Sequence, residues 1–486
     1  MMSSVPVSLT IPSPANSDYS HTNGSSRRLS QTITDIVSVA TPAGRSRSSS
    51  SPPSPIKIEQ GPNKLAITFD GGSQIIVRPN RIVRGVVTLN NIKPVHATQI
   101  RIRFRAEEVA TAKVREYGLE TKIERIDQVV TTHFDTSTKV WGIEPSAYLM
   151  TPWEVIEPGE HKFPFALKFP NVNFPPSTDD PVGFYIHYIW SVHLDGPSFN
   201  PGIRSKEYIM PYRPIICAPL NKEWTYSQAT YNDKRVPIAQ VSAVMPRPAF
   251  CPDETVNMFL QVDCIPTDMI VSSVNYTLNK CSVGQLQLQR GLARRTKSRK
   301  ILQGSLAVSG NAGAVKIPVN FHIPTRLVSP SFQSRHISVY YELAFVIQFT
   351  SHGGLLKSST YGSECTVPIG ITNLPHNHLL HIPNLTSVQS YLQSKESPIF
   401  FDPFLDEPPN QSSIPSELWG PLTAALTTPP ITSPPNYFSL SDLPPQFIQK
   451  DREEKMMFTS RLIKPGMAPE LGDPITIVSE SKDYEW

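Results

Sequence analysis

A Pro-Pro-x-Tyr tetrad in the last tenth of the chain carries the clearest binding chemistry. It is Pro434-Pro435-Asn436-Tyr437. Adjacent prolines fix φ near about −65° and favour a polyproline II helix, which loses little entropy when it docks. Such a helix fits the aromatic groove of a WW domain, and the tyrosine fills a second pocket. We therefore predict that Pro434, Pro435 and Tyr437 bind a WW domain.

A related tetrad follows a few residues later, as Pro444-Pro445-Gln446-Phe447. Phenylalanine stands in the place of the tyrosine and lacks its phenolic hydroxyl. Pro444, Pro445 and Phe447 are thus predicted to form a weak second site. The alternative is a proline-rich spacer without a ligand.

A third short motif, Asp402-Pro403-Phe404, lies upstream of both tetrads. It resembles the peptide that appendage domains of clathrin adaptors accept, because the proline fixes a turn that presents the phenylalanine. Two alternatives stay open. The segment is either an acidic linker, or Phe400–Leu405 docks back onto the folded part of the chain.

A strongly basic stretch, "RGLARRTKSRK", spans residues 290–300. On a loop, each cation contributes about 1 kcal/mol near an anionic leaflet. The stretch is predicted to face membrane lipid or the acidic tail of a membrane cargo. The alternatives are a solvated hairpin loop and a nuclear-import-like patch. Its cations are Arg290, Arg294, Arg295, Lys297, Arg299 and Lys300.

Two serines in the N-terminal stretch are candidate phosphorylation sites. "RRLS" ends at Ser30 and is typical of basophilic kinase sites. Ser50 lies in "RSRSSSSPPSP", and its phosphorylated form would suit a phosphoserine-reading adaptor of the 14-3-3 type, which binds through an arginine cluster.

Signatures of catalysis and of metal or cofactor binding are missing from the sequence. There is no phosphate-binding G-x-x-x-x-G-K, no H-E-x-x-H and no G-x-S-x-G. The five cysteines include no C-x-x-C pair, which argues against a zinc site or a disulfide framework and favours a reducing cytosol. We expect no enzymatic activity and no cofactor.

Charge and hydropathy limit the partners and the location. Lys and Arg number 45 against 41 Asp and Glu, for a net charge of +4, which is too balanced for a nucleic-acid binder. No apolar run approaches the roughly 18 residues that span a bilayer, and the serine-rich start lacks the apolar core of a signal peptide. We expect a cytoplasmic protein that is recruited to membranes as a peripheral component.

The elements that must position these motifs are β-strands. Short apolar or alternating runs rich in Val, Ile, Tyr and Phe recur between residues 61 and 372, separated by Pro, Gly, Asn and Asp. In "QIRIRFRAE" (99–107), Ile100, Ile102 and Phe104 alternate with three arginines. This pattern predicts sandwiches rather than a parallel sheet. The predicted strands include Leu65–Phe69, Gln74–Val77, Gly85–Leu89, Gln99–Arg105, Lys162–Phe169, Phe184–His193, Thr255–Val262, Val274–Leu278, Val315–Ile323 and Ile337–Phe349.

An internal repeat divides this β region in two. Residues 159–194 and 313–347 each contain a strand that ends at a proline, a loop that closes on Pro-Ser, and a long strand centred on a tyrosine. The tyrosines are Tyr188 and Tyr341. The sequence therefore predicts an all-β chain with two tandem immunoglobulin-like β-sandwich domains. Ser- and Pro-rich stretches flank them and are expected to be disordered.

The order of these motifs resembles the arrestin family. The opening strand-turn-strand with Gly85, "GEHKFPFALKFP" and "GFYIHYIWSVHL" are similar to the arrestin N-terminal domain. The second half, closing on "VPIGI" (367–371), is similar to the arrestin C-terminal domain. Cys251-Pro252-Asp253-Glu254 departs from the family's Pro-Gly-Glu turn, and the insertion 106–153 is longer than the family pattern. The short linker and the Pro-Tyr tail resemble the α-arrestins, or arrestin-related trafficking adaptors.

The resemblance implies a domain order. It gives an N-terminal tail (1–60), an arrestin-like N-terminal domain (61–213), a linker (214–235), an arrestin-like C-terminal domain (236–373) and a proline-rich C-terminal tail with the Pro-Pro-x-Tyr motif (374–486). Both tails are expected to be disordered.

The resemblance also implies a function. It is an adaptor that links a transmembrane transporter or receptor cargo to a HECT-type ubiquitin ligase with WW domains, at the plasma membrane or endosomes. Ubiquitination and endocytosis or sorting of the cargo would follow. Two alternatives of the same fold stay open: a signalling scaffold, for instance in ambient-pH sensing, and a retromer-like coat subunit.

Overall fold

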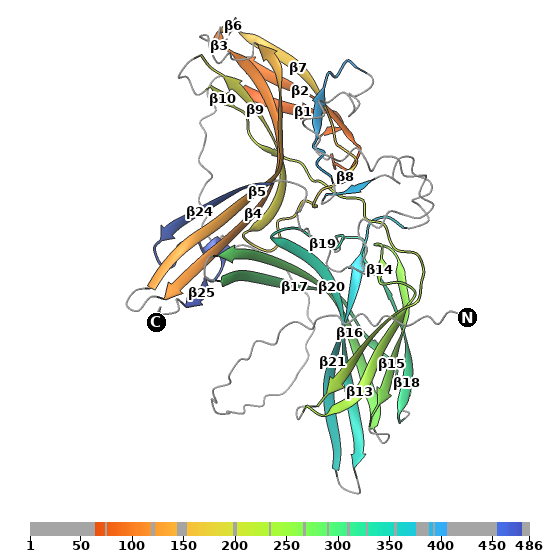
Figure 1. The fold of residues 1–486 in the computed structure, drawn as a ribbon. Helices are drawn as coiled ribbons and strands as arrows, with labels where there is room; N and C mark the ends of the chain where they lie inside the picture. The colour runs from red at the N-terminus through yellow and green to blue at the C-terminus, as the bar shows by residue number, and fades with distance from the viewer. Residues whose placement is uncertain are drawn as a thin grey trace, which may run out of the picture. The chain divides into compact units, whose positions relative to one another are not determined.

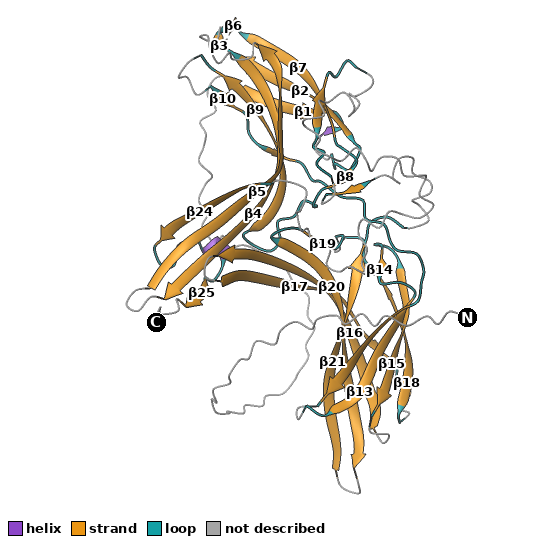
Figure 2. Cartoon of the chain, in the orientation of Figure 1, coloured by secondary structure: helices purple, strands orange, loops and turns teal. Residues whose placement is uncertain are grey.

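Nearly all the regular secondary structure that the computed structural model describes consists of β-strands (Figures 1 and 2). The described residues are 64–72, 75–117, 122–142, 153–197, 202–232, 235–265, 269–288, 291–308, 312–326, 329–353, 357–375, 388–391, 394–405 and 454–478. Among them, no helix has the length and apolarity needed to cross a membrane.

Two sheets build the first sandwich. One has the order β1-β2-β7-β23, and the other has the order β10-β9-β4-β5-β24, with β11 on β9 and β25 on β4. Two short ladders, β3 with β6 and β8 with β22, complete it. The strands are β1 (Lys64–Phe69), β2 (Ile82–Asn91), β3 (Val95–Ala97), β4 (Gln99–Tyr117), β5 (Lys122–Gly142), β6 (Glu154–Ile156), β7 (Gly159–Lys168), β8 (Val172–Asn173), β9 (Phe184–Asp195), β10 (Ile203–Arg204), β11 (Tyr208–Ile209), β22 (Gln389–Ser390), β23 (Ile399–Phe401), β24 (Lys455–Ile463) and β25 (Ile475–Val478).

The alternation in β4 explains how this sandwich closes. Ile100, Ile102 and Phe104 are fully buried, and Phe104 stacks on Trp190 of β9 with ring centroids 4.2 Å apart. Burial of each large apolar side chain contributes about 1.5–3 kcal/mol. The arginines between them face the other way and pair with carboxylates, as Arg101 does with Asp195. These arginines therefore form no free basic surface.

Two further sheets build the second sandwich. Their orders are β12-β13-β15-β18 and β14-β21-β20-β16-β17, with β19 on β20. The strands are β12 (Trp224–Tyr231), β13 (Pro237–Met245), β14 (Ala249–Phe250), β15 (Thr255–Cys264), β16 (Met269–Leu288), β17 (Gly291–Leu306), β18 (Ala314–His322), β19 (Phe332–Gln333), β20 (Ile337–Gly353) and β21 (Lys357–Ile371). The prediction of two tandem β-sandwiches is confirmed.

The repeated tyrosines occupy equivalent places in the two sandwiches. Tyr188 on β9 is buried, and its hydroxyl donates to the carbonyl of Pro175 at 2.6 Å. Tyr341 on β20 is also buried, and its hydroxyl donates to the carbonyl of Ser329 at 2.8 Å. Each tyrosine thus satisfies a backbone group of the proline-containing loop before its own strand, which explains why the repeat keeps both features.

Two local expectations differ from the structure. The stretch 214–235, expected as a linker, contains β12, which pairs with β13 in the second sandwich, so the connection between the sandwiches is shorter. The predicted strand Gln74–Val77 is not a strand in its described part, where Val77 forms one isolated bridge with Tyr212. Pro79, two residues after Val77, lacks the N–H that would continue a ladder.

The C-terminal region departs most from expectation. Residues 374–486 were expected to be disordered, but β22, β23, β24 and β25 all lie within them and all pair with strands of the first sandwich. A short 3-10 helix, η7 (Pro469–Leu471), lies between β24 and β25. Figure 1 shows β24, in blue, alongside the orange β5. The sandwich supplies sheet edges that satisfy these segments, which composition alone does not reveal.

The described part of the insertion 106–153 belongs to the first sandwich. Most of it extends β4 and β5 into a long antiparallel hairpin, paired from Gln99 with Gly142 to Tyr117 with Lys122. β24 lies along the outer edge of this hairpin, and β25 adds in parallel to the end of β4. The insertion therefore forms the platform on which the returning C-terminal segment docks.

Candidate functional site

A buried polar cluster joins parts of the chain that are far apart in sequence. We call Glu108, His133, Arg335, Tyr391 and Glu454 the polar cluster. β4 carries the first residue and β5 the second. The third comes from the turn between β19 and β20, the fourth follows β22, and the fifth directly precedes β24. The cluster is thus the point where both sandwiches and two C-terminal segments meet.

His133 is the centre of this cluster. Its Nδ1 lies 2.9 Å from the hydroxyl of Tyr391 and 3.0 Å from Oε1 of Glu454. Its Nε2 lies 3.6 Å from Oε2 of Glu108. The hydroxyl of Tyr391 also donates to Oε1 of Glu454. One imidazole therefore connects the hairpin platform to both returning segments.

Glu108 connects the platform to the second sandwich. Its Oε1 accepts a hydrogen bond of 2.7 Å from the backbone N–H of His336 and one of 2.6 Å from the hydroxyl of Ser334. The His336 ring lies 3.3 Å from the Thr131 hydroxyl, and burial lowers its pKa. A fully buried carboxylate needs such donors, since an unpaired buried charge is strongly destabilising.

Glu454 is held as a carboxylate although its side chain is only 2 % exposed. Burial by itself would raise its pKa, but the hydrogen bond and charge of His133, the Tyr391 hydroxyl and the charge of Arg335 outweigh that effect. Together they lower the pKa of Glu454 to about 2. Arg335 Nε reaches Oε2 of Glu454 at 3.1 Å. The start of β24 is thus fixed by charge-assisted contacts, which are the stronger class of hydrogen bond.

A second buried carboxylate holds the segment after β24. Glu124 on β5 accepts from Arg115 at 2.6 Å, lies 3.8 Å from Lys113 Nζ, and accepts from the backbone N–H of Gly466 at 3.3 Å. The hydrogen bond from Arg115 lowers the pKa of the Glu124 carboxyl. Both ends of β24 are therefore anchored to the hairpin platform through buried glutamates.

The predicted basic stretch is a strand and not a loop. Gly291–Leu306 forms β17 at the edge of its sheet, so neighbouring cations point to opposite faces. Arg295 donates to the carbonyls of Val182 and Asp473, and Lys297 pairs with Asp180 at 2.7 Å. These two cations are used in contacts with the first sandwich and the tail, so the structure does not gather the whole set on one surface.

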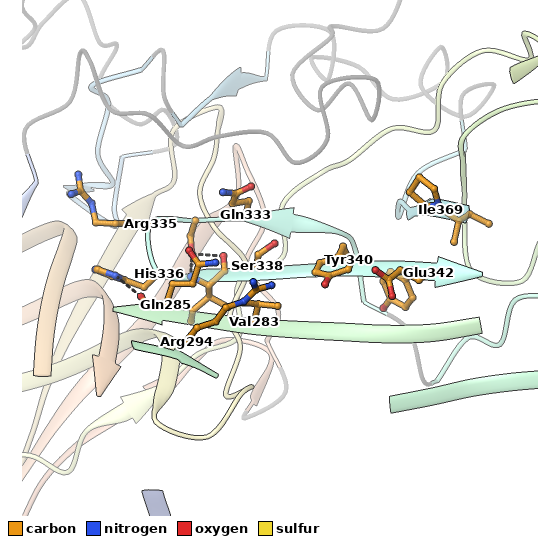
Figure 3. Close-up of a pocket in the computed structure, with 14 residues that line it drawn as sticks. Val283, Gln285, Arg294, Gln333, Arg335, His336, Ser338, Tyr340, Glu342 and Ile369 are labelled. Atoms are coloured by element: carbon orange, nitrogen blue, oxygen red, sulfur yellow. Dashed lines mark hydrogen bonds between the residues drawn. The ribbon is translucent and has the colours of Figure 1, made fainter. Parts of the chain in front are cut away.

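The other cations of that stretch have different places. Arg294 lines a cavity of about 370 Å³, while Arg299 and Lys300 are exposed. Arg290 lies outside the described residues. Along the cavity, Figure 3 shows Arg335 and His336 at one end and Glu342 at the other. Its lining mixes cations, a carboxylate and phenols, which suits a polar peptide better than a purely apolar ligand.

The Asp402-Pro403-Phe404 motif forms a tight, outward-facing turn. Oδ1 of Asp402 accepts from the Phe404 N–H at 2.9 Å, and the Asp402 carbonyl accepts from the Leu405 N–H at 3.0 Å. Arg84 of β2 donates to the Pro403 carbonyl at 2.7 Å. The Phe404 side chain is 81 % exposed. Ile399–Phe401 does dock on the sandwich as β23, but the phenylalanine of the motif stays presented to solvent.

Several predicted site residues fall outside the described part of the chain. They are Ser30, Ser50, Pro434, Pro435, Tyr437, Pro444, Pro445 and Phe447. In sequence, both proline tetrads lie between Leu405 and Glu454, the ends of two docked segments. Among the described residues, no group of three or more His, Cys, Asp or Glu side chains forms a metal site.

Sequence reasoning missed the polar cluster. Its members carry no motif, and Tyr391 and Glu454 lie in a stretch whose composition indicated disorder. One local signal was present. "KMMFTSRLI" (455–463) is an apolar, β-prone run that follows the proline-rich stretch and contains no proline. It is typical of a strand that adds to an existing sheet.

The fold and the polar cluster define a two-sandwich β scaffold that holds its own C-terminal segment. The family model described as "Arrestin (or S-antigen), N-terminal domain" matches residues 65–215, and that described as "Arrestin (or S-antigen), C-terminal domain" matches residues 238–376. The chain belongs to the arrestin family. Proteins of this family are generally adaptors or scaffolds rather than enzymes. A comparison with curated proteins found no match.

Proposed function

We propose that this protein is an adaptor of the α-arrestin type, without catalytic activity of its own. It links a transmembrane transporter or receptor to a HECT-type ubiquitin ligase that carries WW domains. The observation that carries the proposal is the combination of a complete arrestin body with Pro434-Pro435-Asn436-Tyr437 in the segment that follows it. Tyr437 is the principal ligase contact, and Phe447 belongs to a weak second site.

Tethering explains how such a protein acts without an active site. When one chain binds both cargo and ligase, the ligase reaches the cargo at a raised effective concentration. The Pro-Tyr motif lies in sequence between two segments that the first sandwich holds through β23 and β24. Ligase recruitment is thereby linked to the arrestin body at two points of the chain.

Exposed cations and the exposed Phe404 turn are the candidate contacts for cargo and for the trafficking machinery. Arg294, Arg299 and Lys300 remain for an acidic cargo tail or an anionic leaflet, because Arg295 and Lys297 are engaged within the protein. The exposed Phe404 turn suits a clathrin-adaptor appendage domain. The protein acts in the cytoplasm and is recruited to the plasma membrane or endosomes, where phosphorylated Ser30 or Ser50 can engage a 14-3-3-type protein.

Capture by WW domains tests the ligase contact. Full-length protein with Tyr437→Ala is compared with wild type for binding to immobilised WW domains of a HECT-type ligase. Phe447→Ala is the matched control, because it removes an aromatic ring from the neighbouring tetrad. We expect Tyr437→Ala to lose most of the binding and Phe447→Ala to keep most of it. Equal capture of wild type and Tyr437→Ala would contradict the proposal.

Proximity labelling in the native cell tests the adaptor role as a whole. Wild type should label both a WW-containing ligase and a membrane protein, and Tyr437→Ala should keep the membrane protein and lose the ligase. Stable co-purification with coat subunits, unchanged by Tyr437→Ala, would instead indicate a retromer-like subunit.

A further inference from the structure

β24 is an edge strand with an open side. It pairs along its whole length with β5, and among the described residues it has no strand on its other side. An open edge presents a row of unpaired N–H and C=O groups that another strand can satisfy. The outward-facing N–H and C=O groups along this nine-residue strand are therefore available for strand addition.

The side chains of β24 protect this edge only in part. Met456 is 53 % exposed, Phe458 57 % and Leu462 74 %, and Met457 is exposed as well. Natural edge strands are usually short, charged or interrupted by proline. This one carries two cations, Lys455 and Arg461, but it is long, contains no proline and has four large exposed apolar side chains. Such a surface marks an interaction site.

The open backbone edge, more than the distribution of these side chains over the two faces, identifies the kind of partner. Ser460 reaches Asp127 of β5 at 2.5 Å, so the even-numbered residues share the face of that side chain. Met456, Phe458 and Leu462 lie on that face, and Met457 lies on the opposite one. A membrane surface would take up the three apolar side chains of one face but would leave the backbone edge unpaired. An added strand pairs that edge and places its own side chains beside those of β24 on both faces.

We propose that β24 is the interface of a symmetric homodimer, in which it pairs antiparallel with β24 of a second copy. Under a two-fold axis perpendicular to the sheet, the same face of both copies points in the same direction. Even-numbered residues of one strand therefore lie opposite even-numbered residues of the other, and odd-numbered opposite odd-numbered. Three registers then pair seven or more residues. They are centred on Phe458, Thr459 or Ser460.

Charge and apolar contacts select among these registers. Centring on Phe458 places Lys455 opposite Arg461, and like charges directly opposite are destabilising. Centring on Thr459 pairs the whole strand and places Met456 opposite Leu462. Centring on Ser460 places Phe458 opposite Leu462. In both remaining registers, Leu462 of each copy lies opposite an apolar side chain of the other copy, so the strand is complementary to itself.

Dimerisation would matter for the function. If the protein is the ligase adaptor proposed above, a dimer carries two copies of Tyr437 and gains avidity for a ligase with several WW domains. The dimer itself is measured without any ligase, so the two proposals succeed or fail separately.

Sedimentation velocity of the full chain at micromolar concentrations tests the proposal. Wild type should show a concentration-dependent equilibrium between monomer and dimer. Leu462→Glu should weaken association about tenfold or more, because it removes an apolar pair at two symmetric places. Met456→Lys should also weaken association if the register is centred on Thr459, and Phe458→Lys should do so if it is centred on Ser460. Met467→Lys, an equally exposed methionine outside the strand, is the control and should dimerise like wild type.

Combined variants test the pairing directly. Met456→Lys with Leu462→Glu places opposite charges across the interface in the register centred on Thr459, and Phe458→Lys with Leu462→Glu does so in the register centred on Ser460. One of the two should recover dimerisation in a salt-sensitive way and so identify the register. A monomeric wild type, or loss of association that neither combination recovers, would overturn the proposal. A wild type that binds anionic vesicles without self-association would also overturn it.

Discussion

His133 on β5 and Glu454 at the start of β24 are 321 positions apart in the sequence, and Nδ1 of one lies 3.0 Å from Oε1 of the other. Arg335 approaches the same carboxylate from the turn before β20. The docking of the C-terminal segment is therefore coupled to the contact between the two sandwiches. A change that releases β24 acts on a group that the second sandwich also uses.

Removal of the Glu454 carboxylate should loosen the start of β24. In Glu454→Ala, His133 and Arg335 lose a buried charged partner, and a lost buried hydrogen bond costs about 1–3 kcal/mol. We expect faster amide hydrogen exchange in Lys455–Ile463 and little change in β13 or β15. Glu470→Ala removes an exposed carboxylate from the same C-terminal segment and is the control. Equal exchange rates in wild type and Glu454→Ala would show that the polar cluster does not hold β24.

Acid should weaken this contact. The pKa of Glu454 is about 2 in the folded protein against an ordinary value of 4.5. A lowered pKa stabilises the fold fully above about pH 4.5, and the contribution, about 3 kcal/mol, is lost as the pH falls from there towards 2. Exchange of β24 in wild type should approach that of Glu454→Gln in this window.

The comparison at each pH isolates the Glu454 carboxylate together with the side chains that it contacts. His336, whose pKa burial lowers, contributes in both proteins and cancels in the difference. A difference between wild type and Glu454→Gln that stays constant from pH 6 to pH 3 would contradict the assignment.

A methyl group at Gly85 should destabilise the first sandwich. A Cβ at this position would lie 2.5 Å from the Thr68 carbonyl oxygen and 2.8 Å from Cζ of Phe165, which is part of the core. Because neither the backbone nor a buried ring moves freely, Gly85→Ala should lower the free energy of unfolding by about 1–3 kcal/mol. In Gly362→Ala the three atoms nearest to the new Cβ all belong to the flexible end of Gln348, the nearest at 3.3 Å. Similar unfolding midpoints for the two variants would show that the close approach at Gly85 is not required.

The phenylalanines around β23 should separate binding from stability. Phe404 is exposed, so Phe404→Ala should abolish binding to a clathrin-adaptor appendage domain and leave thermal unfolding unchanged. The Phe400 ring packs edge-on against Trp190 with centroids 6.0 Å apart, so Phe400→Ala should loosen β23 and lower stability. Calorimetry with the isolated appendage domain measures the first effect. Undiminished appendage binding by Phe404→Ala would show that the exposed turn is not the docking peptide.

The sequence by itself determined the sandwiches. Alternation in "QIRIRFRAE" is a local property, because successive side chains of a strand point to opposite faces wherever the strand pairs. The repeat around Tyr188 and Tyr341 is local as well, since each hydroxyl bonds to a loop within 13 residues of it. These patterns support the family assignment. The Pro-Tyr motif is likewise read from the sequence alone.

Only the tertiary structure decided how the C-terminal segment and the basic stretch are used. β24 has no core of its own and forms because the edge of β5 satisfies its backbone, while Glu454 is stable as a buried carboxylate because His133 and Arg335 lie beside it. Arg295 and Lys297 are contacts within the protein because Val182 and Asp180 face them. Such partners lie a hundred or more residues away in sequence, and no local pattern contains the energy of a contact between distant segments.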